Sequence, residues 1–273
     1  MKLVTFDDGK VGRVEGDTIA ELDVGSMVEY FERAEVPRAT GEEYPLTEVR
    51  LRAPIVPRKL IHTAGNFREH EEESKRVKWS HRIAPWIFFF QNVDAIIGPN
   101  DPIVYPEHLT SELDYELELA VVISKPGTWF SPEEAEDYIG GYVIFNDITA
   151  RDIQRREMES GVFSFCKAID TFCPLGPWIV TPDEIGDPHD LRMELRVNGE
   201  PRQQSHSGKM SVTIPEILSH YSGVAGFSPD AADLYLKPGD VMEAEIEKVG
   251  VLRNPVVSWQ EAHGEPAPKR VRW

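Results

Sequence analysis

Three carboxylates recur at alternate positions in the stretch LDYELELAVVI, residues 113–123. Successive side chains of a strand point to opposite faces, so Asp114, Glu116 and Glu118 would share one face. The run AVVI that follows is apolar at every position and predicts a strand buried on both sides there. Buried carboxylates must be protonated, paired with cations or bound to a metal. An exposed edge strand with a solvated acidic face would explain the same spacing.

A second group of polar residues lies in FNDITARDIQ, where the predicted strand GYVIFN ends. A helix over DITARDIQRREMES, residues 147–160, is expected to follow, with Gly161 as its end. Arg151 and Gln154 lie four and seven residues after Asp147 and would share its helical face. On its own this pattern favours an N-cap and a surface arginine. Beside the two glutamates, Asp147 would complete an all-oxygen site suited to Mg²⁺, Mn²⁺ or Ca²⁺.

A histidine and a glutamate three residues apart occur in GNFREHEEES. On a helix, His70 and Glu73 would face the same way, and a carboxylate that orients an imidazole suits a general base. The same acidic run would also suit a solvated first helical turn.

A lysine lies among apolar and aromatic residues in FCKAIDTFCPLGP. Lys167 would be partly desolvated there, as expected of a lysine that contacts an anionic substrate, although a surface lysine with a buried stem fits too. Cys166 and Cys173 are predicted to be small buried residues rather than nucleophiles. Their spacing suggests neither a disulfide framework nor a zinc site.

Composition sets limits on the partners. The 273 residues carry a formal net charge of −18, which would repel phosphate backbones, so nucleic acid is not an expected partner. Adaptation to high salt and an ordinary acidic enzyme both fit this charge. No apolar stretch approaches the length of a membrane span, and the N-terminus lacks the apolar core of a signal peptide. We therefore expect no membrane association and a cytoplasmic location.

Many short strand patterns with a few helical ones predict a β-rich α+β fold. The proline-containing segment LRAPIVP suggests a boundary. We expect a small N-terminal α+β domain over residues 1–57, a catalytic domain over 58–260 and a polar tail over 261–273.

In this order, several motifs together resemble the fumarylacetoacetate hydrolase family, from about Lys59 to Pro255. They are GNFREHEEE, GPNDPI, LDYELELAVVI, GYVIFNDITARDIQ, KAIDTFCPLGPWIVT, LRVNGE and LKPGDVMEAEIEKVGVLRNPV. The combination of the DYELEL and FNDITARD blocks is the most specific part. The resemblance implies a rolled mixed β-sheet behind a smaller N-terminal domain, and a homodimer.

The resemblance also implies roles for single residues. A Mg²⁺ or Mn²⁺ site would be formed by Glu116, Glu118 and Asp147. His70 and Glu73 would lie on a mobile catalytic segment. Lys167 would be both catalytic and substrate-binding, and Arg151 and Gln154 would bind substrate.

The activity implied is metal-dependent chemistry on a small-molecule 2-oxo acid through an enolate, with hydrolysis of a C–C bond in an acylpyruvate-type substrate as the first choice. Isomerisation or decarboxylation of unsaturated 2-oxo dicarboxylates and dehydration of sugar acids use the same intermediate and stay open. A non-catalytic binding protein that keeps the fold is a further alternative.

Three features depart from the family pattern. A G-D-x-I-x-T-G-T strand that supplies a threonine usually follows the helix that matches IPEILSHYS, and here LSHYS runs directly into GVAGFSPDAADLYLKPGD. Gln91 replaces a lysine that many relatives carry before the GPND turn. Trp79, Trp86 and residues 88–90, FFF, could recognise an apolar acyl tail, although core or dimer interface is favoured for them.

Overall fold

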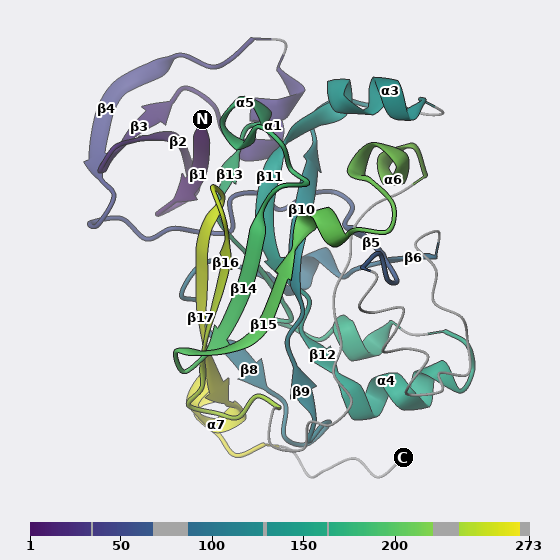
Figure 1. Ribbon diagram of the computed structural model, residues 1–273. Helices are drawn as coiled ribbons and strands as arrows, with labels where there is room; N and C mark the ends of the chain where they lie inside the picture. Colours follow the sequence, from purple (N-terminus) through teal and green to yellow (C-terminus); the bar gives the residue numbers. More distant parts are fainter. Residues whose placement is uncertain (34, 68–86, 128–129, 163, 221–234, 268–273) are drawn as a thin grey trace.

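Two larger sheets and two small ones form the framework of the chain (Figure 1). The computed structural model describes residues 1–33, 35–67, 87–127, 130–162, 164–220 and 235–267. The eight-stranded sheet has the order β10 (Leu117–Ile123), β11 (Ile139–Asn146), β13 (Cys173–Val180), β1 (Lys2–Phe6), β2 (Lys10–Glu15), β3 (Thr18–Leu22), β4 (Ala39–Pro45), with β7 (Ile96–Ile97) parallel to β13. The five-stranded sheet has the order β15 (Glu200–His206), β14 (Arg192–Val197), β16 (Val241–Ile246), β17 (Gly250–Ser258), β8 (Ile103–Tyr105), with β8 parallel to β17. The small sheets pair β9 (Leu113–Asp114) with β12 (Thr149–Ala150), and β5 (Ile61–Thr63) with β6 (Phe88–Phe90).

Short helices lie at the ends and edges of these sheets. They are α1 (Met27–Glu32), α3 (Pro132–Ala135), α4 (Arg151–Met158), α5 (Pro182–Ile185), α6 (Ile214–His220) and α7 (Trp259–His263), with 3-10 turns η1 (Val93–Ala95), η2 (Glu136–Tyr138), η3 (Phe165–Lys167) and η4 (Ser207–Lys209). Within the described ranges, no helix is long and apolar enough to cross a membrane. The predicted β-rich α+β fold with mixed sheets is confirmed. The domain boundaries at residues 57 and 260 stay predictions.

Alternating side chains of β10 and β11 enter two different cores. Leu119 of β10 and Ile144 of β11 pack in one apolar cluster with Leu195 and Ala244 of the five-stranded sheet. Phe145 of β11 belongs to a second cluster, which includes residues of β1 and α1. Since burial of apolar surface is the main favourable term in folding, these two cores hold β10 and β11 firmly in place. The ends of the same two strands carry the acidic residues.

The acidic strand differs from its prediction in two ways. It is not continuous, because β9 pairs with β12 whereas β10 pairs with β11. Between β9 and β10, the backbone N–H of Glu116 donates a hydrogen bond to the side-chain oxygen of Asn146 at 3.0 Å. In a continuous strand, a backbone carbonyl of the neighbouring strand would accept this hydrogen bond. The prediction that both faces of the strand are buried is also wrong at the C-terminal end of β10. Ile123 is 46% exposed there, because β10 is an edge strand of its sheet.

The helix expected from Asp147 begins later, at Arg151. Thr149 and Ala150 are extended because they pair with β9. Only the residues after them can form the helix. It also ends earlier than expected, at Met158 with Glu159 as its C-cap, and Gly161 follows in the turn with a positive φ of 76°, which favours glycine. Ser131 is the N-cap of α3, and β16 pairs with the following strand β17 in an antiparallel hairpin.

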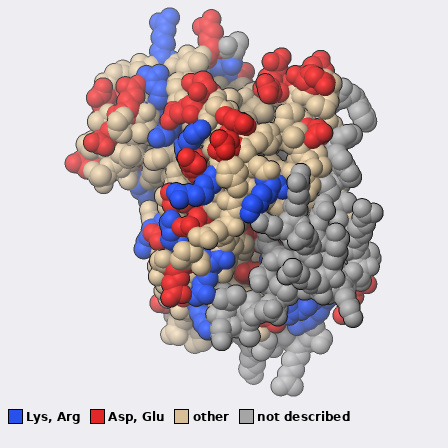
Figure 2. All heavy atoms as spheres, in the orientation of Figure 1, with Lys and Arg blue, Asp and Glu red and all other residues tan. Residues whose placement is uncertain are grey.

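Acidic and basic side chains are interleaved on the face drawn in Figure 2. Among the ion pairs of the five-stranded sheet, Arg196 of β14 contacts Glu194 of the same strand and Glu245 of β16. Solvent-exposed ion pairs contribute about 0–1 kcal/mol each. On this face the excess of acid is therefore spread out rather than gathered into one patch.

Candidate active site and metal centre

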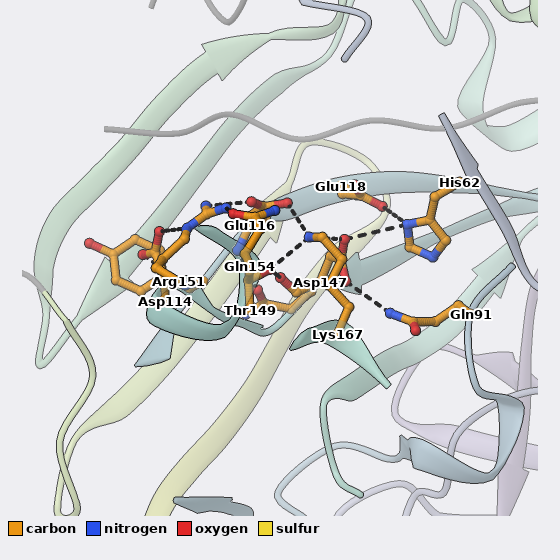
Figure 3. Close-up of polar contacts among 12 residues, drawn as sticks. His62, Gln91, Asp114, Glu116, Glu118, Asp147, Thr149, Arg151, Gln154 and Lys167 are labelled. Atoms are coloured by element: carbon orange, nitrogen blue, oxygen red, sulfur yellow. Dashed lines mark hydrogen bonds and ion pairs between the residues drawn. The ribbon is translucent and has the colours of Figure 1, made fainter. Parts of the chain in front are cut away.

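Buried carboxylates meet where β10 begins and β11 ends (Figure 3). Glu116, Glu118 and Asp147 are each at most 5% exposed. The antiparallel register pairs Glu118 with Phe145, and the backbone N–H of Asp147 donates to the carbonyl oxygen of Glu116 at 2.8 Å. Backbone pairing alone therefore brings the three acidic residues together.

The ammonium group of Lys167 lies between two of these carboxylates. From η3, its Nζ donates to Asp147 Oδ2 at 2.5 Å, to Glu116 Oε2 at 2.9 Å and to Thr149 Oγ1 at 2.7 Å. Burial would lower the pKa of Lys167, but Asp147 and Glu116 outweigh it and raise that pKa above its ordinary value. Lys167 therefore stays charged at any physiological pH and acts as a donor, not as a base.

Arg151 is buried near Lys167, and both cations contact Glu116. Its Nε donates to Asp114 Oδ2 at 2.7 Å, its Nη1 donates to Gln154 Oε1 at 2.9 Å, and its Nη2 forms an ion pair with Glu116. Burial would lower the pKa of Arg151, whereas Glu116 and Asp114 raise it. The guanidinium is thus held on three sides, which fixes the direction of the first turn of α4.

His62 of β5 faces the other side of the carboxylate group. Its Nδ1 lies 3.1 Å from Glu118 Oε2 and 3.6 Å from Asp147 Oδ2. Neither ring nitrogen makes an aligned hydrogen bond with the described residues. The ring stacks on Phe89 at 5.0 Å and meets the edge of Phe145 at 4.9 Å. His62 is therefore a buried imidazole aimed at two carboxylates.

The charges of this site do not cancel. Asp114, Glu116, Glu118 and Asp147 face two permanent cations, Lys167 and Arg151, and the imidazole of His62. Burial would lower the pKa of His62, but Glu118 and Asp147 outweigh it and raise that pKa. Even a protonated His62 leaves one formal negative charge. Burial raises the pKa of Glu118 and that of Asp114, because a desolvated carboxylate is costly. The site would gain from a bound divalent cation.

The donors present fit such a cation. His62, Glu118 and Asp147 each offer one ligand atom, and these three atoms lie within 4.8 Å of one another. Gln91 Nε2 donates to Asp147 Oδ1 at 3.0 Å, and second contacts of this kind orient a ligating carboxylate. Among the described residues, this is the group with the spacing of a metal site.

Most of the residues predicted from the sequence converge here. Glu116, Glu118, Asp147, Lys167, Arg151 and Gln154 form one connected set (Figure 3). Their functional roles stay predictions. His70, Glu73, Trp79 and Trp86 lie outside the described residues, as does most of the segment after α6 in which the departure from the family pattern was found.

Sequence reasoning missed His62. It lies in the segment KLIHTAG, whose pattern is that of a buried strand, and a histidine in such a strand is more often a plain core residue. A polar residue within an otherwise apolar strand was the one available signal. Gln91 was singled out only as a departure from relatives, and its bond to Asp147 could not be foreseen.

The comparisons with known proteins agree with this geometry. Residues 59–257 match the family model described as fumarylacetoacetate (FAA) hydrolase C-terminal. The chain belongs to the fumarylacetoacetate hydrolase family. Residues 1–54 match a second model, Rv2993c-like, N-terminal.

Relatives within the family carry different activities. The chain is 38% identical to the oxaloacetate tautomerase YisK of Bacillus subtilis, over 78% of this chain and 75% of that protein. It is 32% identical to a 2,4-didehydro-3-deoxy-L-rhamnonate hydrolase of a Sphingomonas species, over 94% of this chain and 92% of that protein. Maleylpyruvate hydrolase from Sphingobium sp. SYK-6, solved with manganese(II) and pyruvate, superposes with a TM-score of 0.72 at 28% identity, covering 94% of this chain and 99% of that one. Membership in the family thus supports an enzyme without choosing the reaction.

Proposed function

We propose that this protein is a divalent-metal-dependent enzyme that acts on 2-oxo acids through their enol form, with C–C hydrolysis of an acylpyruvate-type substrate as the reaction. The carrying observation is the excess of buried carboxylates over cations at this site, beside an ammonium group that stays protonated. The manganese and pyruvate found in a related hydrolase support the same class of ligand.

We propose that Glu116, Glu118 and Asp147 hold Mg²⁺ or Mn²⁺. Once bound, such an ion polarises a carboxylate and an adjacent oxygen as a Lewis acid. Lys167 then supplies a fixed positive charge where negative charge develops on the substrate, since its pKa keeps all three protons in place.

Arg151 and Gln154 position the substrate in this proposal. Arg151 is held by Asp114 and Gln154, so its direction is set before any substrate arrives, and preorganised charge stabilises a transition state without further rearrangement. His70 with Glu73 is assigned the activation of water. A homodimer is proposed with this function.

Keto–enol tautomerisation of a 2-oxo dicarboxylate is the second candidate. The 38% identity to an oxaloacetate tautomerase favours it, and it needs no attacking water, only a site that holds the enol. Decarboxylation, other isomerisations and sugar-acid dehydration use the same residues and would be recognised by their products.

The test follows the ultraviolet absorbance of the enol for a panel of acylpyruvates and unsaturated 2-oxo dicarboxylates, with Mg²⁺, Mn²⁺ or EDTA. Hydrolysis releases two acids, tautomerisation releases none, and decarboxylation releases CO₂. Glu118→Ala should abolish the metal-dependent change, whereas Glu112→Ala, which removes a carboxylate paired with the exposed Arg155, should not. A flat trace for every substrate, with metal binding measured separately, would contradict an enzyme of this class and favour a binding protein.

A further inference from the structure

The candidate metal-binding group of His62, Glu118 and Asp147 includes an imidazole nitrogen. We infer that His62 is a direct ligand of the divalent ion, together with Glu118 and Asp147, and that it makes the site prefer transition metals such as Mn²⁺ and Co²⁺ to Mg²⁺. This rests on the metal site of the proposed function and adds a ligand to it.

Glu116 is the least available of the predicted carboxylate ligands. Its Oε2 accepts from Lys167 at 2.9 Å, and its Oε1 forms the ion pair with Arg151. Both oxygens are thus already engaged by permanent cations. Glu118, by contrast, lies next to His62.

The position of His62 is fixed without a metal. The ring is 2% exposed, stacked on Phe89 and set against Phe145, and β5 is paired with β6. A buried polar atom without a hydrogen bond costs about 1–3 kcal/mol. The imidazole lies at ion-pair distance from Glu118 and Asp147 but makes no aligned hydrogen bond with the described residues, and ligation through Nδ1 would recover that cost.

A nitrogen donor changes which metal fits best. Mg²⁺ prefers six oxygens in near-ideal octahedral geometry, whereas imidazole suits later divalent metals and follows the order Mn²⁺ < Co²⁺ < Ni²⁺. A nitrogen ligand, the Nδ1 of His62, beside the carboxylate oxygens should therefore strengthen Co²⁺ binding more than Mg²⁺ binding.

Calorimetric titration of the full-length protein with Co²⁺ and with Mg²⁺ tests this. For His62→Ala and His62→Gln, the Co²⁺ dissociation constant should rise about tenfold or more, and that for Mg²⁺ less than about threefold. His108→Ala is the matched control, since His108 also has an unpartnered buried Nδ1 but packs against Trp259. Its two dissociation constants should equal those of the wild type. Equal losses for both metals in the His62 variants, or no loss, would overturn the assignment.

A spectroscopic measurement detects the ligand directly in the wild-type protein. Electron spin-echo envelope modulation of the Mn²⁺-loaded wild type should show a directly bound ¹⁴N, which disappears in His62→Gln and persists in His70→Ala. A bound Mn²⁺ without nitrogen coupling, or coupling lost only in His70→Ala, would reject His62 as the ligand while leaving the metal site intact. If Asp147→Asn leaves metal binding unchanged, the metal site of the proposed function itself fails.

Discussion

Lys167 Nζ lies 2.5 Å from Asp147 Oδ2, and both groups are almost completely buried. The chain separates these residues by a strand end, a helix and a loop, so the contact depends on the whole fold. A buried ion pair is costly to form, and removal of one partner is costlier still, because it leaves an unpaired charge in the interior. The pair therefore has consequences for both stability and catalysis.

Lys167→Met should lower kcat by about a hundredfold or more, as loss of one preorganised donor does in other enzymes. It should also destabilise the metal-free protein by about 3–5 kcal/mol, since two carboxylates lose their cation. Steady-state kinetics and urea unfolding would measure the two effects. Lys167→Arg keeps the charge and should retain most of the stability but not the rate. A Lys167→Met enzyme with normal kcat would remove Lys167 from the mechanism.

Asp114→Asn should act on the substrate through Arg151. The amide keeps the shape of the carboxylate but loses its charge, and a hydrogen bond to a charged group contributes about 1.5–3 kcal/mol. We expect KM to rise about tenfold or more while the dissociation constant for Mn²⁺ stays unchanged, because Asp114 contacts Arg151 and is not part of the His62, Glu118 and Asp147 group. Glu112→Gln serves as the control, because Glu112 pairs with the exposed Arg155. Weaker metal binding with unchanged KM would contradict this role.

The carboxylates were predictable because strand alternation and spacing depend only on local geometry. The break after Asp114 was not, because it depends on the side chain of Asn146, which approaches from a neighbouring strand. The late start of α4 has a similar cause, since the pairing of Thr149 with Asp114 overrides local helix propensity. His62 contacts Glu118 only because β5 lies against the end of β10. No local pattern in the sequence predicts this contact.

The two cysteines should react only slowly with thiol reagents in the folded protein. Cys166 and Cys173 are fully buried and free, and burial raises the pKa of both thiols. Since the thiolate is the reactive form, their labelling by an aromatic disulfide reagent at pH 8 should be at least about a hundredfold slower than that of glutathione. Two thiols should react at once in guanidinium chloride. Rapid labelling of one thiol in the native state would show a more open segment around η3 or β13.

Removal of the metal should lower Tm, because the excess negative charge of the carboxylates then remains buried. A ligand at one hundred times its Kd stabilises the folded state by about 2.7 kcal/mol. Differential scanning calorimetry with Mn²⁺ and with EDTA should therefore show a clear difference for the wild type.

Glu118→Gln is the informative variant for this measurement. Burial raises the pKa of Glu118, so its ionised form is unfavourable without a metal, and the neutral amide avoids that cost. The variant should lose the shift caused by Mn²⁺ yet match or exceed the Tm of the wild type in EDTA. Glu112→Gln should keep the full shift. A lower Tm for Glu118→Gln in EDTA would mean that the contact with His62 stabilises the metal-free protein more than desolvation of the carboxylate destabilises it.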